Sequence, residues 1–314
     1  MSNFNDHPDL FMKPKTEQYG THMVMTNVTQ PNRMKYVNID SKFKEDYLDN
    51  VTSNSHPDLL SNQLSTANFN VSLPERINNV KSISVVQTEI PLSFYNISKN
   101  LGNSYFKVTV SGVETIIQID DNYYNKTDLT IEINNKLTAE GINMVFDIVS
   151  ADKSSIIMGS GAATIHFDVN SAGHQDKYRF KSKLGWILGF RQLTYDLTTS
   201  STISEEFSNL NGTKYLYLAV DEFSKGNQYS FLGPLSSSLV NKNILARISI
   251  DAHNYSYKSL LTANISNGYL TSDTRQYNGN VDLQKLNIQL LNEDGNPVIL
   301  NGLDFSFCMK VEYQ

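Results

Sequence analysis

Two pairs of adjacent carboxylates are the residues in this sequence best suited to chemistry. Asp120 stands next to Asp121, and Asp221 next to Glu222, each pair at the end of a run of residues that predicts a strand. Two carboxylates close together can serve as acid and base in glycoside hydrolysis, or can bind Ca²⁺ through their oxygens. No EF-hand or acid–base motif surrounds either pair, and carboxylates commonly form turns. We therefore expect turn residues here, and keep a sandwich-fold hydrolase as a hypothesis.

Histidine and cysteine offer no stronger catalytic site. The six histidines lack the spacing of metal ligands, and His174 and Asp176, which share a loop and could hydrogen-bond, have no nucleophile near them in the sequence. Cys308, the only cysteine, alternates onto the more polar face of a predicted strand with no base beside it. The segment Gly159-Ser160-Gly161 is typical of a turn. The sequence thus predicts no catalytic, metal-binding or cofactor-binding residue, and no enzyme.

Four tyrosines support a different hypothesis. Tyr215, Tyr217, Tyr255 and Tyr257 have Asn and Asp residues close by in the sequence. Aromatic rings beside a few polar groups are typical of ligand sites. A carbohydrate-binding or receptor-binding β-sandwich therefore remains an alternative to a purely structural protein.

Composition excludes several classes of function. The chain has 314 residues, 39% of them hydrophobic and 18% charged, with a net charge of -6 and no run of Lys or Arg. Such a chain can bury a core but lacks the positive surface that nucleic acid requires. The single cysteine agrees with assembly in a reducing compartment, and no apolar run is long enough to span a membrane. The first residues lack the pattern of a signal peptide, so we expect a cytosolic protein.

Residues 1–65 differ from the rest of the chain. They contain Pro8, Pro14, Pro31 and Pro57, half of the eight prolines, and show almost no apolar periodicity. This composition predicts an extended arm. Because basic residues do not outnumber acidic ones in it, we expect the arm to bind another protein.

Strand patterns dominate from Asn68 onward. Phe69 and Leu73 alternate with polar residues up to Pro74, where we expect a break, and a β-branched run then continues to Pro91. Further alternating segments predict a hairpin around Ser111-Gly112, a C-terminal hairpin at residues 286–300, and a last strand through Phe305, Phe307, Met309 and Val311.

One helix is expected, from a cap at Thr127 to a stop at Gly141. Many short strands with a single helix predict an all-β, antiparallel jelly-roll sandwich over residues 66–314. Residues 120–235 exceed what a minimal jelly roll needs, so we expect an insertion or a second β subdomain there.

The heptamer Leu184–Phe190, LGWILGF, holds the only tryptophan. Charged neighbours leave it too short to cross a membrane, so we expect Trp186 and Phe190 to fill the space between sheets. Gly185 and Gly189 would then allow close backbone approach or a positive φ. The predicted structural core is Trp186, Phe190, Gly185, Gly189, Phe69, Leu73, Phe305 and Phe307.

Several short stretches together carry a resemblance to a known family. They are residues 36–43, 69–80, 88–95, 102–106, 184–190 and 304–313. In these stretches the chain resembles the jelly-roll minor capsid proteins of large nucleocytoplasmic DNA viruses. The resemblance implies a structural virion protein that is assembled in the host cytoplasm, either as a penton at five-fold vertices or as a linker beneath the major capsomers. It also implies a major capsid protein and other capsid subunits as partners, a homo-oligomer such as a pentamer, and no cofactor.

Overall fold

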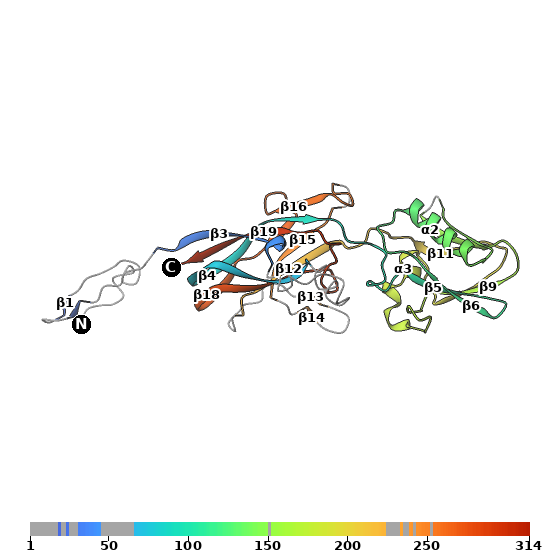
Figure 1. Ribbon diagram of the computed structural model, residues 1–314, viewed down its shortest axis with the longest axis horizontal. Coiled ribbons are helices and arrows are strands. Elements are labelled where there is room, and N and C mark those ends of the chain that lie inside the picture. The colour runs from blue at the N-terminus through green and yellow to red at the C-terminus, as the bar shows by residue number, and fades with distance from the viewer. Residues whose placement is uncertain are drawn as a thin grey trace, which may run out of the picture.

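The computed structural model describes residues 31–44, 66–149, 152–223, 243–251 and 254–314, together with four two-residue strands. Those strands are β1 (Gln18–Tyr19), β2 (Met23–Val24), β13 (Gly233–Pro234) and β14 (Leu239–Val240). The described residues form two lobes, each around its own hydrophobic core (Figure 1). We name the lobe that holds the C-terminus the jelly-roll lobe, and the lobe built from residues 97–210 the distal lobe. Most of the expected arm, residues 1–65, lies outside the described residues.

The jelly-roll lobe contains one antiparallel sheet in the order β17-β15-β12-β18-β4-β19-β3, with β16 also paired to β4. This sheet curls around its own core, so the prediction of an all-β, antiparallel jelly-roll sandwich is confirmed. Its strands are β3 (Arg33–Asp40), β4 (Asn68–Pro91), β12 (Tyr215–Asp221), β15 (Ile244–Ser249), β16 (Leu260–Asn264), β17 (Leu270–Ser272), β18 (Arg275–Leu291) and β19 (Ser306–Tyr313). A short 3₁₀ helix, η2 (Ser41–Phe43), follows β3.

Strand β4 continues through the expected break at Pro74. It runs for 24 residues, and its register against β18 shifts between the pairs Ser72↔Lys285 and Ile77↔Leu283. Proline cannot donate to a strand ladder but is tolerated where a bulge interrupts the pairing. Pro74 lies in this irregular stretch and is exposed, so the strand bends there and goes on.

The last strand lies inside the sheet, between β4 and β3. Its Phe305 end packs edge-on against Phe69 at 6.0 Å, and Phe307 is fully buried. Leu73 is buried in the same core. Strand β3 falls within the range expected to be arm, yet it pairs with β19 along its whole length because Val37 and Ile39 turn inward.

The distal lobe contains two antiparallel sheets, ordered β10-β9-β5-β6 and β11-β8-β7. The distal lobe begins before the insertion expected at 120–235, because the hairpin around Ser111-Gly112 belongs to this lobe. The lobe also ends before residue 235, because β12 pairs with β18 in the jelly-roll sheet. Both turn residues have positive φ, 49° and 82°, which the tight turn requires. Its elements are β5 (Tyr105–Val110), β6 (Val113–Gln118), α2 (Lys126–Ala139), β7 (Met144–Ile148), β8 (Lys153–Met158), β9 (Ala163–His166), η3 (Lys177–Ser182), α3 (Leu184–Ile187), β10 (Thr194–Leu197) and β11 (Thr202–Phe207).

Two predicted boundaries differ in the structure. The cap of α2 is Asn125 and not Thr127, since the Asn125 side chain accepts a hydrogen bond from Asp128 N at 2.8 Å. The C-terminal hairpin returns as a loop after its turn. It makes one isolated bridge, Leu291↔Pro297, on either side of which Asn292 N donates to the Asn296 carbonyl and Val298 N to the Leu290 carbonyl.

Asn96 ties together the two segments that connect the lobes. Its Nδ2 donates to the carbonyls of Tyr124 and Leu210, both at 2.8 Å, and its Oδ1 accepts from Tyr124 N at 2.8 Å. The side chain is buried, and Asn103 Nδ2 donates to its carbonyl. Every polar atom of this amide therefore has a partner from a distant part of the chain.

We expect Asn96→Leu to lower the free energy of unfolding by about 2–4 kcal/mol, because it leaves buried backbone groups without partners. Urea unfolding followed by circular dichroism would measure the loss. Asn100→Leu is the matched control, since Asn100 is exposed on the same connecting segment. Equal effects of the two substitutions would contradict this role for Asn96.

Candidate functional site

The heptamer Leu184–Phe190 lies in the distal lobe, where its glycines admit close packing. Phe190 is fully buried and stacks on Phe167 with 5.0 Å between ring centroids. The Phe167 ring occupies the space that a side chain at Gly185 would need, and the Glu206 carbonyl does the same at Gly189, where φ is +92°.

Trp186 is half-buried at the surface, which corrects the expectation that it fills the space between sheets. Leu184 and Leu188 are buried one helical turn apart, so a residue midway between them points away from the core. The indole instead meets Arg191, whose guanidinium carbon lies 4.0 Å from the ring centroid, and the edge of Phe180 at 5.7 Å. This exposed indole is the starting point of the candidate site.

A groove of about 470 Å³ lies beside Trp186, between the two lobes. The distal lobe contributes Trp186, Lys181 and Arg191 to its wall. The jelly-roll lobe contributes the turn after β18, with Glu293 and Asp294. Residues of the connecting segments, among them Gly212 and Thr213, line the groove between these walls. We call this space the inter-lobe groove.

Tyr195 and Glu205 hold Arg191 at the groove. The Tyr195 hydroxyl accepts from the Arg191 amide at 2.9 Å and donates to Glu205 Oε2 at 2.6 Å. Burial and the hydrogen bond to Glu205 raise the pKa of Tyr195 to about 12, so the phenol stays a donor at neutral pH. Arg191 Nη1 also donates to the carbonyls of Trp186 and Phe190.

The charges of the groove are divided between its walls. Lys181 and Arg191 lie on the distal wall with Lys214 near the floor, and Glu293 and Asp294 lie opposite. Glu293 accepts a hydrogen bond from the Lys214 amide, but no ion pair joins the five side chains among the described residues. The groove therefore offers separated cationic and anionic groups to a ligand. Charged residues flank the only tryptophan in the sequence. They could have indicated a ligand site, but we used them only to exclude a membrane span.

The four tyrosines expected to bind carbohydrate do not share a surface. Tyr217 is buried, and Tyr215 lies under the Arg247 guanidinium at 4.2 Å. Tyr255 packs edge-on against Tyr269. Tyr257 stacks on Tyr123 of the distal lobe at 4.5 Å, a second contact between the lobes. The four tyrosines therefore do not form one exposed aromatic site, and the carbohydrate- or receptor-binding alternative stays a prediction.

The carboxylates of the first acidic pair have structural partners. Asp120 accepts from Lys136 Nζ at 2.9 Å, and Asp121 accepts from the Lys99 amide at 2.8 Å. Both are exposed in the loop before α2. They serve a turn and an ion pair, as their position at a strand end indicates.

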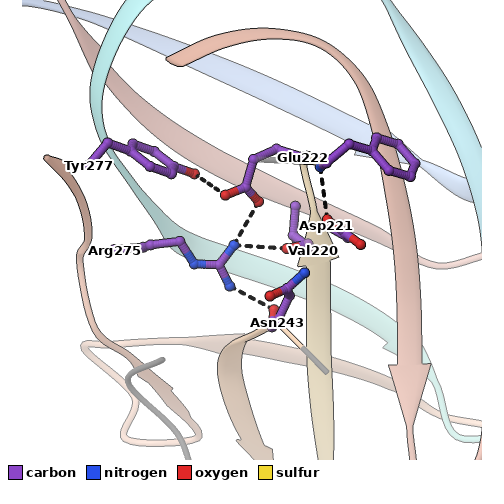
Figure 2. Close-up of polar contacts among 7 residues, drawn as sticks. Val220, Asp221, Glu222, Asn243, Arg275 and Tyr277 are labelled. Carbon is purple, nitrogen blue, oxygen red and sulfur yellow. Dashed lines mark hydrogen bonds and ion pairs between the residues drawn. The ribbon is translucent and has the colours of Figure 1, made fainter. Parts of the chain in front are cut away.

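The second acidic pair splits between surface and core (Figure 2). Asp221 accepts from the Phe223 amide, whereas Glu222 is buried and accepts from Arg275 Nη1 and from the Tyr277 hydroxyl, both at 2.8 Å. Arg275 also donates to the carbonyls of Val220 and Asn243. Burial, and then the Glu222 carboxylate, raise the pKa of Tyr277, so its hydroxyl stays protonated. This buried cluster joins β12 to β18 and exposes no reactive group.

The other residues considered for a catalytic site, Cys308 and Asp176, also have structural roles. Burial, and then Glu89, raise the pKa of the Cys308 thiol, which keeps it protonated at neutral pH. Asp176 accepts from Lys183 Nζ at 2.9 Å, so its partner is a lysine and not His174. Within the described ranges no three His, Cys, Asp or Glu side chains are grouped to hold a metal ion. None of the described helices has the length and apolarity of a membrane span.

Comparison with known proteins gives likenesses in structure but none in sequence. No family model and no curated protein matches the sequence. Among solved structures, the chain is similar to the mavirus penton protein at 11% identity and a TM-score of 0.45, with 90% of this chain and 100% of that chain covered. At that identity and TM-score the likeness carries no functional argument, so function has to be argued from the chain's own residues.

The buried ion pair gives a prediction for stability. Glu222→Gln leaves the Arg275 charge in a site where its side chain is only 2% exposed, so we expect a loss of about 3–5 kcal/mol in the free energy of unfolding. Replacing both residues, as Glu222→Leu with Arg275→Met, removes the buried charge and should restore part of the loss; the carbonyls of Val220 and Asn243 and the Tyr277 hydroxyl still lose their partners. Asp152→Asn, which breaks an exposed ion pair with Lys126, serves as the control for urea unfolding. A double variant as unstable as the single one would refute the argument.

The heptamer gives a second stability prediction. Gly189→Ala puts a methyl group against the Glu206 carbonyl at a positive φ, so we expect a loss of about 3 kcal/mol or more. Urea unfolding followed by the fluorescence of Trp186 would measure it in the distal lobe. Gly279→Ala, where a Cβ meets nothing within 4 Å, should have a much smaller effect. Equal stability of the two variants would exclude the predicted clash.

Proposed function

We propose that this chain is a structural capsid protein without enzymatic activity, which assembles with its own copies and with a major capsid protein into an icosahedral shell. One observation carries the proposal. Strand β3, at the end of the jelly-roll lobe away from the distal lobe, has exposed apolar side chains and, among the described strands, no partner on its outer edge (Figure 1). Such a surface suits assembly and has no use in an isolated monomer.

The edge of β3 has few of the features that normally prevent strands from pairing with another chain, although Arg33 and Lys35 carry charge there. Its eight residues contain no proline, and its register against β19 has no bulge. On its other side no described strand is paired with it. The charge of Lys35, which would discourage pairing, is held by Glu75 at 2.9 Å. An exposed, regular edge of this kind accepts a strand from a neighbour.

The outer face of β3 is apolar as well. Met34 is 62% exposed, Tyr36 is 64% exposed, and Phe43 in η2 is 71% exposed. Methionine and aromatic residues are enriched in protein interfaces. Together with the edge of β3, these side chains form a surface through which two subunits can bind by backbone hydrogen bonds and by apolar contacts.

The stretches that resemble the minor capsid proteins agree with this role. Residues 36–43 form most of β3 and η2, residues 69–80 lie along β4, residues 88–95 contain its end, and residues 304–313 contain β19. Three neighbouring strands of the sheet edge thus carry much of the resemblance. On this basis we propose a minor capsid protein of the virion, assembled in the host cytoplasm, which acts either as a penton at five-fold vertices or as a linker beneath the major capsomers.

The test is the oligomeric state of the full chain. We expect light scattering to show a concentration-dependent oligomer, and the double variant Met34→Lys, Tyr36→Lys to shift it to monomer because charge replaces apolar contact. The melting temperature should stay unchanged, since both side chains are exposed. Val113→Lys, at a residue 67% exposed in the distal lobe, is the matched control. A wild-type monomer at every concentration that is also absent from purified particles would refute the proposal.

A further inference from the structure

We propose that the inter-lobe groove binds an acidic oligosaccharide. This activity goes beyond assembly and uses a different part of the molecule from β3. The volume of about 470 Å³ lies within the roughly 300–1,000 Å³ typical of small-molecule sites. The groove combines apolar and polar groups from both lobes, as such sites do.

The cations of the groove are its most informative feature. Lys107, Lys126 and Lys136 elsewhere in the distal lobe each pair with a carboxylate. Lys181, Arg191 and Lys214 have no such partner among the described residues, although the chain carries a net charge of -6. The groove thus has three cations against the two carboxylates of Glu293 and Asp294, and this excess favours a ligand with an anionic group, which guanidinium and ammonium groups bind by charge-assisted hydrogen bonds.

The opposite wall selects among anionic ligands. Glu293 and Asp294 would repel the successive negative charges of an acidic peptide or a nucleic acid strand. They accept hydrogen bonds from hydroxyl groups, and Asn209 in the connecting segment adds an amide that can donate and accept. A sugar ring with one carboxylate or sulfate and several hydroxyls meets both walls at once. The division of charge therefore favours an acidic saccharide over a polyanion.

Trp186 adds a mixed surface to the same groove. The half-buried indole lines the groove with Lys181 Nζ 5.8 Å from its ring centroid, and the described residues provide no acceptor for its Nε1–H. Indole groups with one apolar and one polar side are common in ligand sites. Because Trp186 is the only tryptophan in the chain, its fluorescence reports on this groove alone.

The experiment is a fluorescence titration of the full chain with 3′-sialyllactose, which carries one carboxylate, with lactose as the neutral control and a heparin-derived tetrasaccharide as the polyanion control. We expect a saturable change with 3′-sialyllactose, weaker binding of the heparin tetrasaccharide and no change with lactose. Lys181→Ala and Arg191→Ala should each weaken binding about tenfold, since each removes a charge-assisted hydrogen bond. Lys81→Ala, on β4 away from the groove, should bind as the wild type does.

Calorimetry would repeat the measurement for Arg191→Ala, because loss of the stacked guanidinium also changes the indole emission. No response to 3′-sialyllactose, unchanged affinity in both variants, or equal binding of the heparin tetrasaccharide or of a hexaglutamate peptide would overturn the proposal. The Met34→Lys, Tyr36→Lys variant should keep wild-type sugar affinity. Loss of sugar binding and loss of assembly are thus separate results, and failure of one leaves the other intact.

Discussion

Backbone pairing along β4 is the constraint on which the jelly-roll lobe depends. On one edge this strand pairs first with β18 and then with β16, and on the other edge it pairs with β19. Its bend near Pro74 lets one continuous strand follow a curled sheet, because the bulged pairing there costs little. The core of the lobe, the edge strand β3 and the position of the distal lobe all follow from the path of this strand.

The pattern of the sequence predicts the fold class because alternation in a strand is a local property. Phe69, Leu73 and Phe307 alternate with polar residues and are buried. The expected break at Pro74 is wrong because tolerance of proline depends on the partner strand, which local sequence does not specify. The assignment of β3 to the arm failed for the same reason, since its partner β19 lies more than 260 residues away along the chain.

The candidate site was predictable only in part. Phe190 and Gly189 are packed in the distal core, but Trp186 is not, because a four-residue helix turns it away from Leu184 and Leu188. No periodicity signals so short a helix. The inter-lobe groove forms because the turn at Glu293, in one lobe, lies near Lys181 of the other lobe. This proximity depends on tertiary structure, which a local sequence pattern does not predict. The sequence did not predict the buried ion pair between Glu222 and Arg275 either, because a carboxylate at a strand end usually faces solvent.

The position of β19 between β4 and β3 determines the order in which the jelly-roll sheet can form on the ribosome. A nascent chain emerges from its N-terminus, so β3 and β4 leave the exit tunnel long before the strand that must insert between them. The distal lobe, whose contacts lie within residues 97–210, can fold meanwhile. The jelly-roll sheet has to wait for β19, and until then β3 and β4 expose ladder edges to which chaperones or sister chains can bind.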